Sequence, residues 1–340
     1  MTRIAIVTDI HHGAPSHTKR GDTALELLAA FIDWANAEKP DLVLELGDRI
    51  SDVDSQTDAR LEREVTELFA RLEMPVHHIC GNHDRDHLSV GDNAEILGRD
   101  LSHEVIDLGA WQLALWRADS KIHRAAPRPG FDLPEADLLW LSQMAQRAGK
   151  PTLVASHVPF SEHSQTGNYY FQRNASLSTY PQSERARAAL AQARVPVVCV
   201  AGHVHWNTVT TVDGIPHITQ QSLTESFTTG GEPARAWGLL ELGETVNWEV
   251  FGDDPFQARL TPRARRWTPP LAPSCASLQR NDRLCRSRPR AFGSRPPHRL
   301  WRCGGRARAF LRHSPWRDPG AGRRKRVGQE RDSAVDPAAC

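Results

Sequence analysis

The chain has 340 residues, enough for one large domain or two ordinary ones with a sizeable core. Its formal net charge of +1 conceals an asymmetry: residues 1–260 carry 22 Lys and Arg against 36 Asp and Glu, whereas residues 261–340 carry 20 against 5. The acidic balance of the first part argues against a nucleic-acid-binding stripe there, and no apolar run approaches the roughly 18 to 20 residues that span a bilayer.

The six cysteines divide in the same way as the charge. Cys80 and Cys199 each lie inside an apolar, strand-like run, and the other four are scattered through the last part without CxxC spacing. Two isolated, buried thiols argue against a disulfide framework and favour a reducing compartment. Because the chain also starts without a charged-then-apolar leader, we expect a cytoplasmic, soluble protein.

The first part of the chain alternates short apolar runs with amphipathic segments of helical length. This spacing predicts strands over residues 3–9, 40–48 and 75–84, and helices over residues 22–39 and 57–73. A βαβαβ order is typical of parallel strands that are joined by crossover helices.

Later segments alternate less regularly and contain more strands. We expect strands around a turn at Gly109, a helix over 133–149, a strand over 151–160, a helix over 183–194, and then strands and hairpins over 195–205, 206–222, 236–243 and 245–252. Asp213-Gly214 is the turn signal of the hairpin within 206–222. An α/β part followed by a mostly β part predicts two sheets packed face to face, with helices outside.

Residues 259–340 differ from the domain that we predict over residues 1–258. Arg, Pro and Gly recur there without a period, and ten of the 23 prolines follow Gln257. Such a composition cannot easily bury a core, so we expect a disordered tail. The tail is either a basic segment that binds RNA or a membrane, or a translated stretch, such as a shifted reading frame, without a selected function. Aperiodic Arg with stray Cys and Trp favours the second interpretation.

Five polar clusters each begin where an apolar, strand-like run ends, which is where open α/β sheets place their sites. They are TDIHHG (8–13), LGDR (46–49), GNHD (81–84), SHVP (156–159) and AGHVH (201–205). Each has an ordinary explanation when it is considered alone. Asp48 could cap a helix, His157 could be a satisfied core or loop histidine, and isolated His-x-His pairs are common.

Taken together, the clusters supply seven oxygen and nitrogen ligands: Asp9, His11, Asp48, Asn82, His157, His203 and His205. Seven ligands suffice for two divalent ions if one carboxylate bridges them. Carboxylate, imidazole and carbonyl donors without thiolate suit Mn, Fe or Zn. Two ions about 3.5 to 4 Å apart form a clamp that is used for hydrolysing phosphate esters.

The ordered set D-x-H, G-D, G-N-H-D, H and G-H-x-H resembles the signature of the calcineurin-like metallophosphoesterases, and all five blocks are present in order. The resemblance implies a four-layered α/β/β/α sandwich of two mixed sheets with a dinuclear metal centre. It further implies that the first metal is held by Asp9, His11 and His205, the second by Asn82, His157 and His203, and that Asp48 bridges both. Spacing and size are most similar to the branch of bacterial class III cyclic-nucleotide phosphodiesterases and glycerophosphodiesterases.

The expected mechanism follows from charge. Two cations lower the pKa of a water between them, give a hydroxide nucleophile near neutral pH, and offset the charge of an in-line transition state. The resemblance implies that His83 lies beside the substrate oxygens and that Asp84 orients its ring. We predict that His83 stabilises the transition state or protonates the leaving alkoxide.

Other substrate contacts are less sharply indicated. His12 follows a ligand histidine and would face the site unless it is a surface histidine. Tyr169 and Tyr170 belong to loop 161–182, which holds all three tyrosines of the chain. That loop would form a lid that stacks on a base or aryl group, or a lid or dimer contact with ordinary core aromatics. Residues 85–87 either line the pocket or are solvated turn residues.

We therefore predict a metal-dependent phosphodiesterase that acts on cyclic nucleotides or a broad range of small phosphodiesters, with a phosphomonoesterase at the same site as the alternative. A diester leaves one charge fewer to neutralise, and no Arg cluster for a dianionic monoester is evident near the motifs. A non-catalytic scaffold would be marked by lost ligands, and none is lost. Nucleic acid would bind only through the basic tail; we expect no membrane association, and a homo-oligomer is compatible with the chain.

Overall fold

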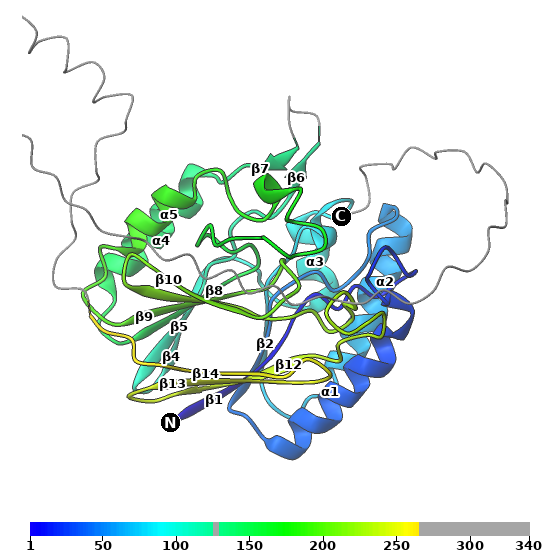
Figure 1. Ribbon diagram of the computed structural model, residues 1–340, viewed down its shortest axis with the longest axis horizontal. Coiled ribbons are helices and arrows are strands. Elements are labelled where there is room, and N and C mark those ends of the chain that lie inside the picture. Colours follow the sequence, from blue (N-terminus) through cyan, green and yellow to red (C-terminus); the bar gives the residue numbers. More distant parts are fainter. Residues whose placement is uncertain (125–128, 265–340) are drawn as a thin grey trace, which may run out of the picture. The chain divides into compact units, whose positions relative to one another are not determined.

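Two six-stranded sheets form the centre of the computed structural model, which describes residues 1–124 and 129–264 (Figure 1). Helices cover the outer faces of both sheets, which gives the four layers α/β/β/α that the sequence predicts. The predicted disordered tail lies outside the described residues from residue 265 onward. None of the helices in the described part has the length and apolar composition needed to cross a membrane.

The first sheet combines parallel and antiparallel pairs. Its strands, in spatial order, are β14 (Phe256–Leu260), β13 (Val246–Phe251), β12 (Trp237–Leu242), β1 (Thr2–Val7), β2 (Leu42–Glu45) and β3 (Val76–His78). β1, β2 and β3 run parallel, as the βαβαβ pattern predicts, and β12 joins β1 antiparallel. β14 was not predicted, because its exposed and half-buried side chains give a weak apolar signal. It carries the sheet two residues past the boundary predicted at 258.

The second sheet has four parallel strands between two antiparallel edges. Its spatial order is β10 (Thr208–Val212), β11 (Ile215–Thr219), β9 (Val197–Ala201), β8 (Thr152–Ser156), β5 (Trp111–Leu115) and β4 (Glu104–Leu108). The predicted turns are present at both edges. Gly109 turns β4 into β5, and Asp213-Gly214, both at positive φ, turns β10 into β11.

Three apolar layers hold the sheets and helices together. Ile4 and Ile6 of β1 point into the core between the sheets, whereas Ala5 and Val7 point to the core beneath the helices, because successive strand side chains face opposite sides. A third layer joins the outer face of the second sheet to its helices, with Val154 and Leu141 among its members. Both faces of the central strands are therefore buried, as in parallel sheets generally.

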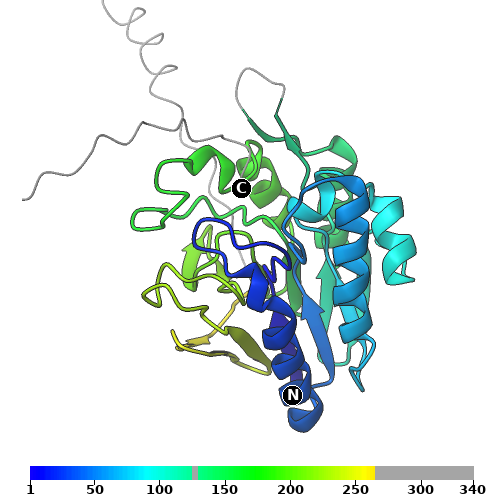
Figure 2. The same ribbon diagram turned by 90° about the vertical axis from the view of Figure 1, so that its right-hand side faces the viewer.

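Helices α1 (Ala24–Glu38) and α2 (Ser55–Phe69) belong to the first sheet, and α4 (Glu135–Arg147) and α5 (Ser183–Leu190) to the second. Figure 2 shows α1 and α2, both blue, side by side, in agreement with their contacts. All four were predicted to within a few residues. Short elements were missed, since they are too brief to show a period: α3 (Val90–Leu97), β6 (Ile122–His123), β7 (Gly130–Phe131) and the 3-10 turns η1 (Gly21–Thr23), η2 (His83–Arg85) and η3 (Ala175–Leu177).

Candidate metal centre

The polar clusters meet where five parallel strands end. The loops after β1 and β2 continue the parallel pairing of these strands, since the Asp9 amide donates to the Gly47 carbonyl at 2.9 Å. In the second sheet the loops after β8 and β9 do the same, since the Gly202 amide donates to the His157 carbonyl at 3.1 Å. The carboxyl ends of strands from both sheets therefore converge on one place.

Six of the predicted ligands form two groups in which donor atoms lie within 4.8 Å of one another. One group is Asp9, His11, Asp48 and His205, and the other is Asp48, His157 and His203. Asp48 belongs to both. The seventh ligand, Asn82, joins the second group, because its side-chain oxygen lies 3.2 Å from His157 Nε2.

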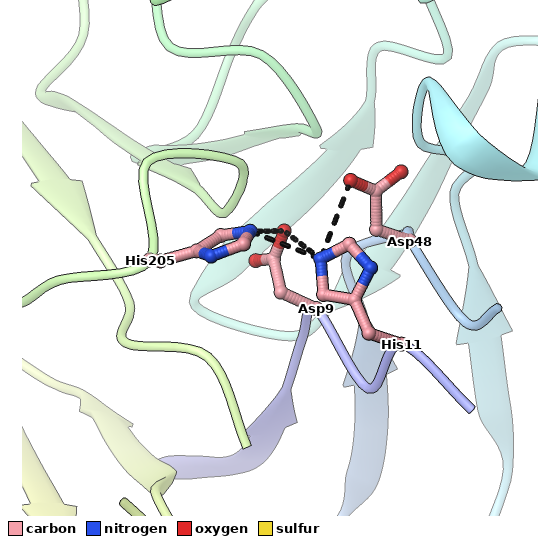
Figure 3. A group of neighbouring side chains, drawn as sticks. All are labelled: Asp9, His11, Asp48 and His205. Carbon is pink, nitrogen blue, oxygen red and sulfur yellow. Dashed lines mark hydrogen bonds and ion pairs between the residues drawn. The ribbon is translucent and has the colours of Figure 1, made fainter. Parts of the chain in front are cut away.

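In the first group the Nε2 atoms of two imidazole rings face each other (Figure 3). His11 Nε2 and His205 Nε2 are 3.0 Å apart, and Asp9 Oδ1 is 3.3 Å from His205 Nε2. Asp48 Oδ2 lies 3.8 Å from His11 Nε2. Two nitrogen donors and two buried carboxylates that face one point form a donor set for a divalent cation.

The second group contains a buried nitrogen that no described protein group satisfies. His203 is buried, and its Nδ1 has no hydrogen-bond partner among the described residues. Leaving such an atom unpaired costs about 1–3 kcal/mol. Asp48 Oδ2 and Asn82 Oδ1 lie 3.4 Å and 3.2 Å from His157 Nε2 in the same group. The residues present therefore fit a bound cation.

Outer partners fix the orientation of three ligand histidines, so that the opposite ring nitrogen faces the centre. His157 Nδ1 donates to the Leu46 carbonyl at 2.8 Å, and His203 Nε2 donates to the Leu177 carbonyl at 2.8 Å. His205 Nδ1 lies 2.7 Å from a carboxylate oxygen of the buried Glu225. Such partners set the tautomer and raise the basicity of a metal ligand. Sequence reasoning missed all three partners, since two are backbone carbonyls and Glu225 is not part of a motif.

The backbone at the centre is held in an uncommon conformation. Five ligand residues have left-handed φ values: Asp9 (52°), His11 (50°), Asp48 (57°), His203 (68°) and His205 (59°). For residues other than glycine this conformation costs about 1–3 kcal/mol and persists only where the surroundings enforce it. Here the enforcing contacts include the His203 amide, which donates to both Asp9 carboxylate oxygens at 2.9 and 3.1 Å.

Two positions near the centre require glycine, because the backbone there passes too close to the carboxylates of predicted ligands to leave room for a side chain. A Cβ on Gly81 would collide with the Asp48 carboxylate, and a Cβ on Gly202 would lie 2.6 Å from Asp9 Oδ2. Any side chain at either position would displace a ligand. The glycines of GNHD and AGHVH therefore serve the geometry of the centre.

Asp84 does not orient His83, contrary to the expectation from the resemblance. Its carboxylate accepts hydrogen bonds from the backbone amides of Gly81, Asp48 and Arg49 at 2.7, 2.9 and 2.8 Å. The reason is local: His83 and Asp84 lie in the 3-10 turn η2, in which successive side chains point about 120° apart.

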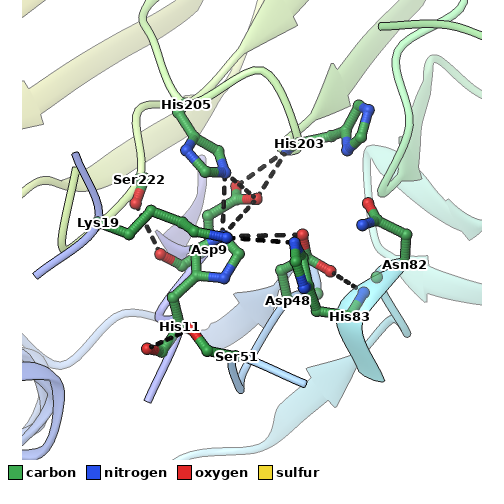
Figure 4. A network of polar contacts seen from close by, with 12 residues as sticks. Asp9, His11, Lys19, Asp48, Ser51, Asn82, His83, His203, His205 and Ser222 are labelled. Carbon is green, nitrogen blue, oxygen red and sulfur yellow. Dashed lines mark hydrogen bonds and ion pairs between the residues drawn. The ribbon is translucent and has the colours of Figure 1, made fainter. Parts of the chain in front are cut away.

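The partner of the His83 ring is Asp52 instead. His83 Nδ1 contacts Asp52 Oδ1, and the His83 backbone amide donates to Asp48 Oδ1 at 2.8 Å. On the other side of the ring, Nε2 lies 3.3 Å from Lys19 Nζ, and Figure 4 shows the Lys19 side chain pointing toward His83 and the ligands. Sequence reasoning missed Asp52 and Lys19, because neither belongs to a polar cluster that follows a strand.

His12 contacts helix α2 in this structure, and a substrate contact by His12 stays a prediction. Its Nε2 lies 2.6 Å from Glu64 on α2. The backbone amides of His11 and His12 continue the pairing with the loop after β2, donating to the carbonyls of Asp48 and Arg49 at 3.0 and 2.8 Å. His11 lies among the predicted ligands, whereas His12 contacts the helix.

Loop 161–182 reaches the centre through other residues than its tyrosines. Besides the Leu177 carbonyl, the Phe171 ring lies 5.0 Å from the His203 ring. Tyr180 is buried in the layer between the second sheet and its helices, Tyr169 is 53% exposed, and Tyr170 packs edge-on against Phe171. Substrate contacts by Tyr169 and Tyr170 stay a prediction.

A buried arginine lies directly beneath the centre. The Arg49 guanidinium contacts carboxylate oxygens of Glu45, Glu62 and Asp84 at 2.7, 2.8 and 3.3 Å, and all four side chains are fully buried. Burial raises the pKa of Glu62 to about 8 and that of Asp84 above its ordinary value despite the adjacent guanidinium, whereas at Glu45 the contacts with Arg49 and His78 outweigh burial and lower the pKa.

The ligand histidines differ strongly in basicity. Burial opposes their protonation, but the adjacent Asp48 raises the pKa of His157 to about 9, and Asp9 with Glu225 raises that of His205 to about 9. Burial dominates at His203, where it lowers the pKa to about 3. Without a metal, protons on His157 and His205 therefore balance part of the carboxylate charge.

The chain belongs to the calcineurin-like phosphoesterase family, since the profile of that family matches residues 2–207. Among solved structures, a dimetal phosphatase from Danio rerio is similar in fold, with a TM-score of 0.61 and 16% identity over 76% of this chain and 98% of that one. A purple acid phosphatase from yellow lupin (Lupinus luteus) seeds is similar with a TM-score of 0.51 and 14% identity, over 75% of this chain and 53% of that one. No curated protein sequence matches the chain significantly.

We expect metal affinity to rise with pH. A bound cation displaces the protons of His157 and His205, whose pKa values are about 9 in the metal-free site. Below pH 9 each released proton increases the affinity about tenfold per pH unit. Calorimetric titration with Mn²⁺ at pH 6.5 to 8, in two buffers of different ionisation enthalpy, measures the number of protons released. An affinity independent of pH, with no proton release, would contradict this account of the site.

Replacing the buried Arg49 beneath the centre by an uncharged residue should destabilise the fold. Arg49→Met leaves three carboxylates buried without their guanidinium, and we expect a loss of about 3–5 kcal/mol in the free energy of unfolding, measured with urea. Part of the loss should be recovered toward pH 5, because the carboxylates then take up protons. The control is Arg71→Met, which removes a partly exposed ion pair with Asp33 and should change stability by less than about 0.5 kcal/mol. Equal stability of the two variants would disprove the role of Arg49.

Proposed function

We propose that the chain hydrolyses phosphoric esters at a dinuclear metal centre. The observation that carries the proposal is the sharing of Asp48 by two groups of ligand atoms, each with a size and composition that suits one cation. The proposed ligands are the seven from the sequence: Asp9, His11, Asp48, Asn82, His157, His203 and His205. All seven are present and lie together, which argues against a non-catalytic scaffold.

When bound, two divalent cations would act as Lewis acids that lower the pKa of a water and offset the charge on the phosphoryl oxygens. Donors of this kind suit Mn, Fe or Zn. Asn82 adds an oxygen donor without adding charge, so it preserves the Lewis acidity at the second position. The buried, unpaired thiols Cys80 and Cys199 suit a reducing, cytoplasmic setting.

His83 is the residue that we place next to the reacting atoms. Its backbone amide is held by Asp48 and its Nδ1 by Asp52, so the ring has one fixed orientation. The remaining nitrogen, Nε2, points toward Lys19 at the ligand cluster. A proton at Nε2 would pass to the leaving oxygen of the ester, with Asp52 as the positioning residue.

For the substrate we propose a cyclic nucleotide or a broader range of small phosphodiesters. The resemblance to the branch of cyclic-nucleotide phosphodiesterases and glycerophosphodiesterases implies substrates of this kind. A diester carries one negative charge fewer than a monoester, and the sequence shows no Arg cluster near the motifs that would neutralise a dianionic monoester. A phosphomonoesterase is a second candidate, and one specific observation favours it: Lys19 contributes a cation beside His83 that the sequence did not reveal.

Metal-reconstituted protein should hydrolyse bis(p-nitrophenyl) phosphate and cyclic AMP faster than p-nitrophenyl phosphate. The three rates at pH 7.5, with and without a chelator, test both parts of the proposal. Faster turnover of the monoester than of either diester would overturn the preference for diesters. No metal-dependent turnover of any of the three would overturn the hydrolase itself. Asp48→Asn, which weakens the shared carboxylate, should reduce all rates together.

His83→Ala should impair alkyl esters far more than p-nitrophenyl esters. An alkoxide needs a proton to leave, and loss of a general acid costs about 10²- to 10⁴-fold, whereas p-nitrophenolate leaves as a stable anion. The comparison is kcat/KM for matched alkyl and p-nitrophenyl esters, with wild type and variant at the same metal content. Asp52→Asn should act in the same direction with a smaller loss. Equal losses for both leaving groups would leave His83 a purely electrostatic role.

A further inference from the structure

Lys19 is a lysine whose side chain is buried at the metal centre. Only 6% of the residue is exposed. The loop that carries it is fixed on both sides: the amides and carbonyls of Ser16 and Lys19 pair at 3.0 and 2.8 Å, and the Arg20 amide donates to the Thr224 carbonyl at 3.0 Å. The backbone thus directs Lys19 inward, where Nζ lies 3.3 Å from His83 Nε2.

No carboxylate in the described part of the chain forms an ion pair with Lys19, whose ammonium contacts the His83 ring instead. Buried lysines are almost always paired, because an isolated ammonium in a poorly solvated place is costly. An unprotonated Nε2 satisfies one of the three ammonium protons, and an Nε2 that carries the proton for the leaving group satisfies none. The side chain is therefore prepared for an anion that the protein itself does not supply.

The charges around the centre lead to the same conclusion. Four carboxylates contact the ligand histidines or His83: Asp9, Asp48, Asp52 and Glu225. Two divalent cations would balance these four charges, and Lys19 would offset the charge of the hydroxide that they provide. Its ammonium beside His83 is then a local positive charge that favours the more highly charged of two otherwise similar ligands.

We propose that Lys19 binds the second negative charge of a phosphoryl dianion and thereby determines the preference between monoesters and diesters. A monoester offers three non-bridging oxygens that share two charges, so one oxygen remains for a charge-assisted hydrogen bond from Nζ. In a diester that third oxygen carries an organic group and no charge. The inference rests on the proposed phosphoesterase function and concerns the selectivity of the same centre.

The test compares Lys19→Met with wild type on two esters and on a non-reacting anion. Lys19→Met should lower kcat/KM for p-nitrophenyl phosphate about 10- to 100-fold, the usual contribution of a charge-assisted hydrogen bond. For bis(p-nitrophenyl) phosphate the change should stay within about threefold. Calorimetric binding of inorganic phosphate to the metal-loaded protein should weaken by the same factor as the monoester. Lys150→Met, which removes only a surface ion pair with Asp107, should change none of the three.

Equal losses on both esters, or phosphate binding unchanged by Lys19→Met, would overturn the inference while leaving the hydrolase intact. Wild-type protein that turns over neither ester but binds phosphate in a Lys19-dependent manner would overturn the function and retain the anion site. If Lys19→Met does not fold, Lys19→Gln takes its place, and wild-type binding of phosphate is compared with that of dimethyl phosphate. Equal affinity for these two anions would also contradict the role of Lys19.

Discussion

The centre depends on one buried carboxylate, Asp84, which ties together the loops that follow β2 and β3. It accepts the backbone amides of Asp48 and Gly81, so the bridging ligand and the strand end that precedes Asn82 are fixed relative to each other. The Arg49 guanidinium pairs with this carboxylate and also with the carboxylates of two buried glutamates. A fully buried cluster of this kind is stabilising only while complete, because each member leaves an unpaired charge behind when it is removed. The same contacts that stabilise the fold therefore position the metal ligands.

Around this anchor the protein holds the site in a form that is costly without ions. Five predicted ligands have left-handed backbone, His203 Nδ1 is buried without a partner in the described part of the chain, and the facing nitrogens of His11 and His205 require a proton or a cation between them. These costs are sustained by the surrounding backbone hydrogen bonds and by the outer partners of the histidines. A preorganised donor set of this kind needs little rearrangement when a cation binds, which favours both affinity and electrostatic catalysis.

The residues next to the predicted ligands differ in charge and therefore in the roles that we propose for them. His83 contacts Asp52 on one side and Lys19 on the other, so in the proposed function a proton carrier would lie beside a fixed cation. Asn82 would contribute a ligand oxygen without adding negative charge. These proposed roles agree with membership of the calcineurin-like phosphoesterase family.

The sequence by itself determined the two sheets, the long helices and the seven candidate ligands, because strand periodicity and the polar residues at strand ends are local patterns. It also indicated the family through the order of five short motifs. Only the tertiary structure decided which residues surround those ligands. Asp52, Lys19 and Glu225 arrive through loops without a motif, Asp84 accepts backbone amides in place of orienting the His83 ring, and His12 contacts Glu64. The physical reason is that a ligand's own position follows from its strand, whereas its partners depend on how distant loops pack.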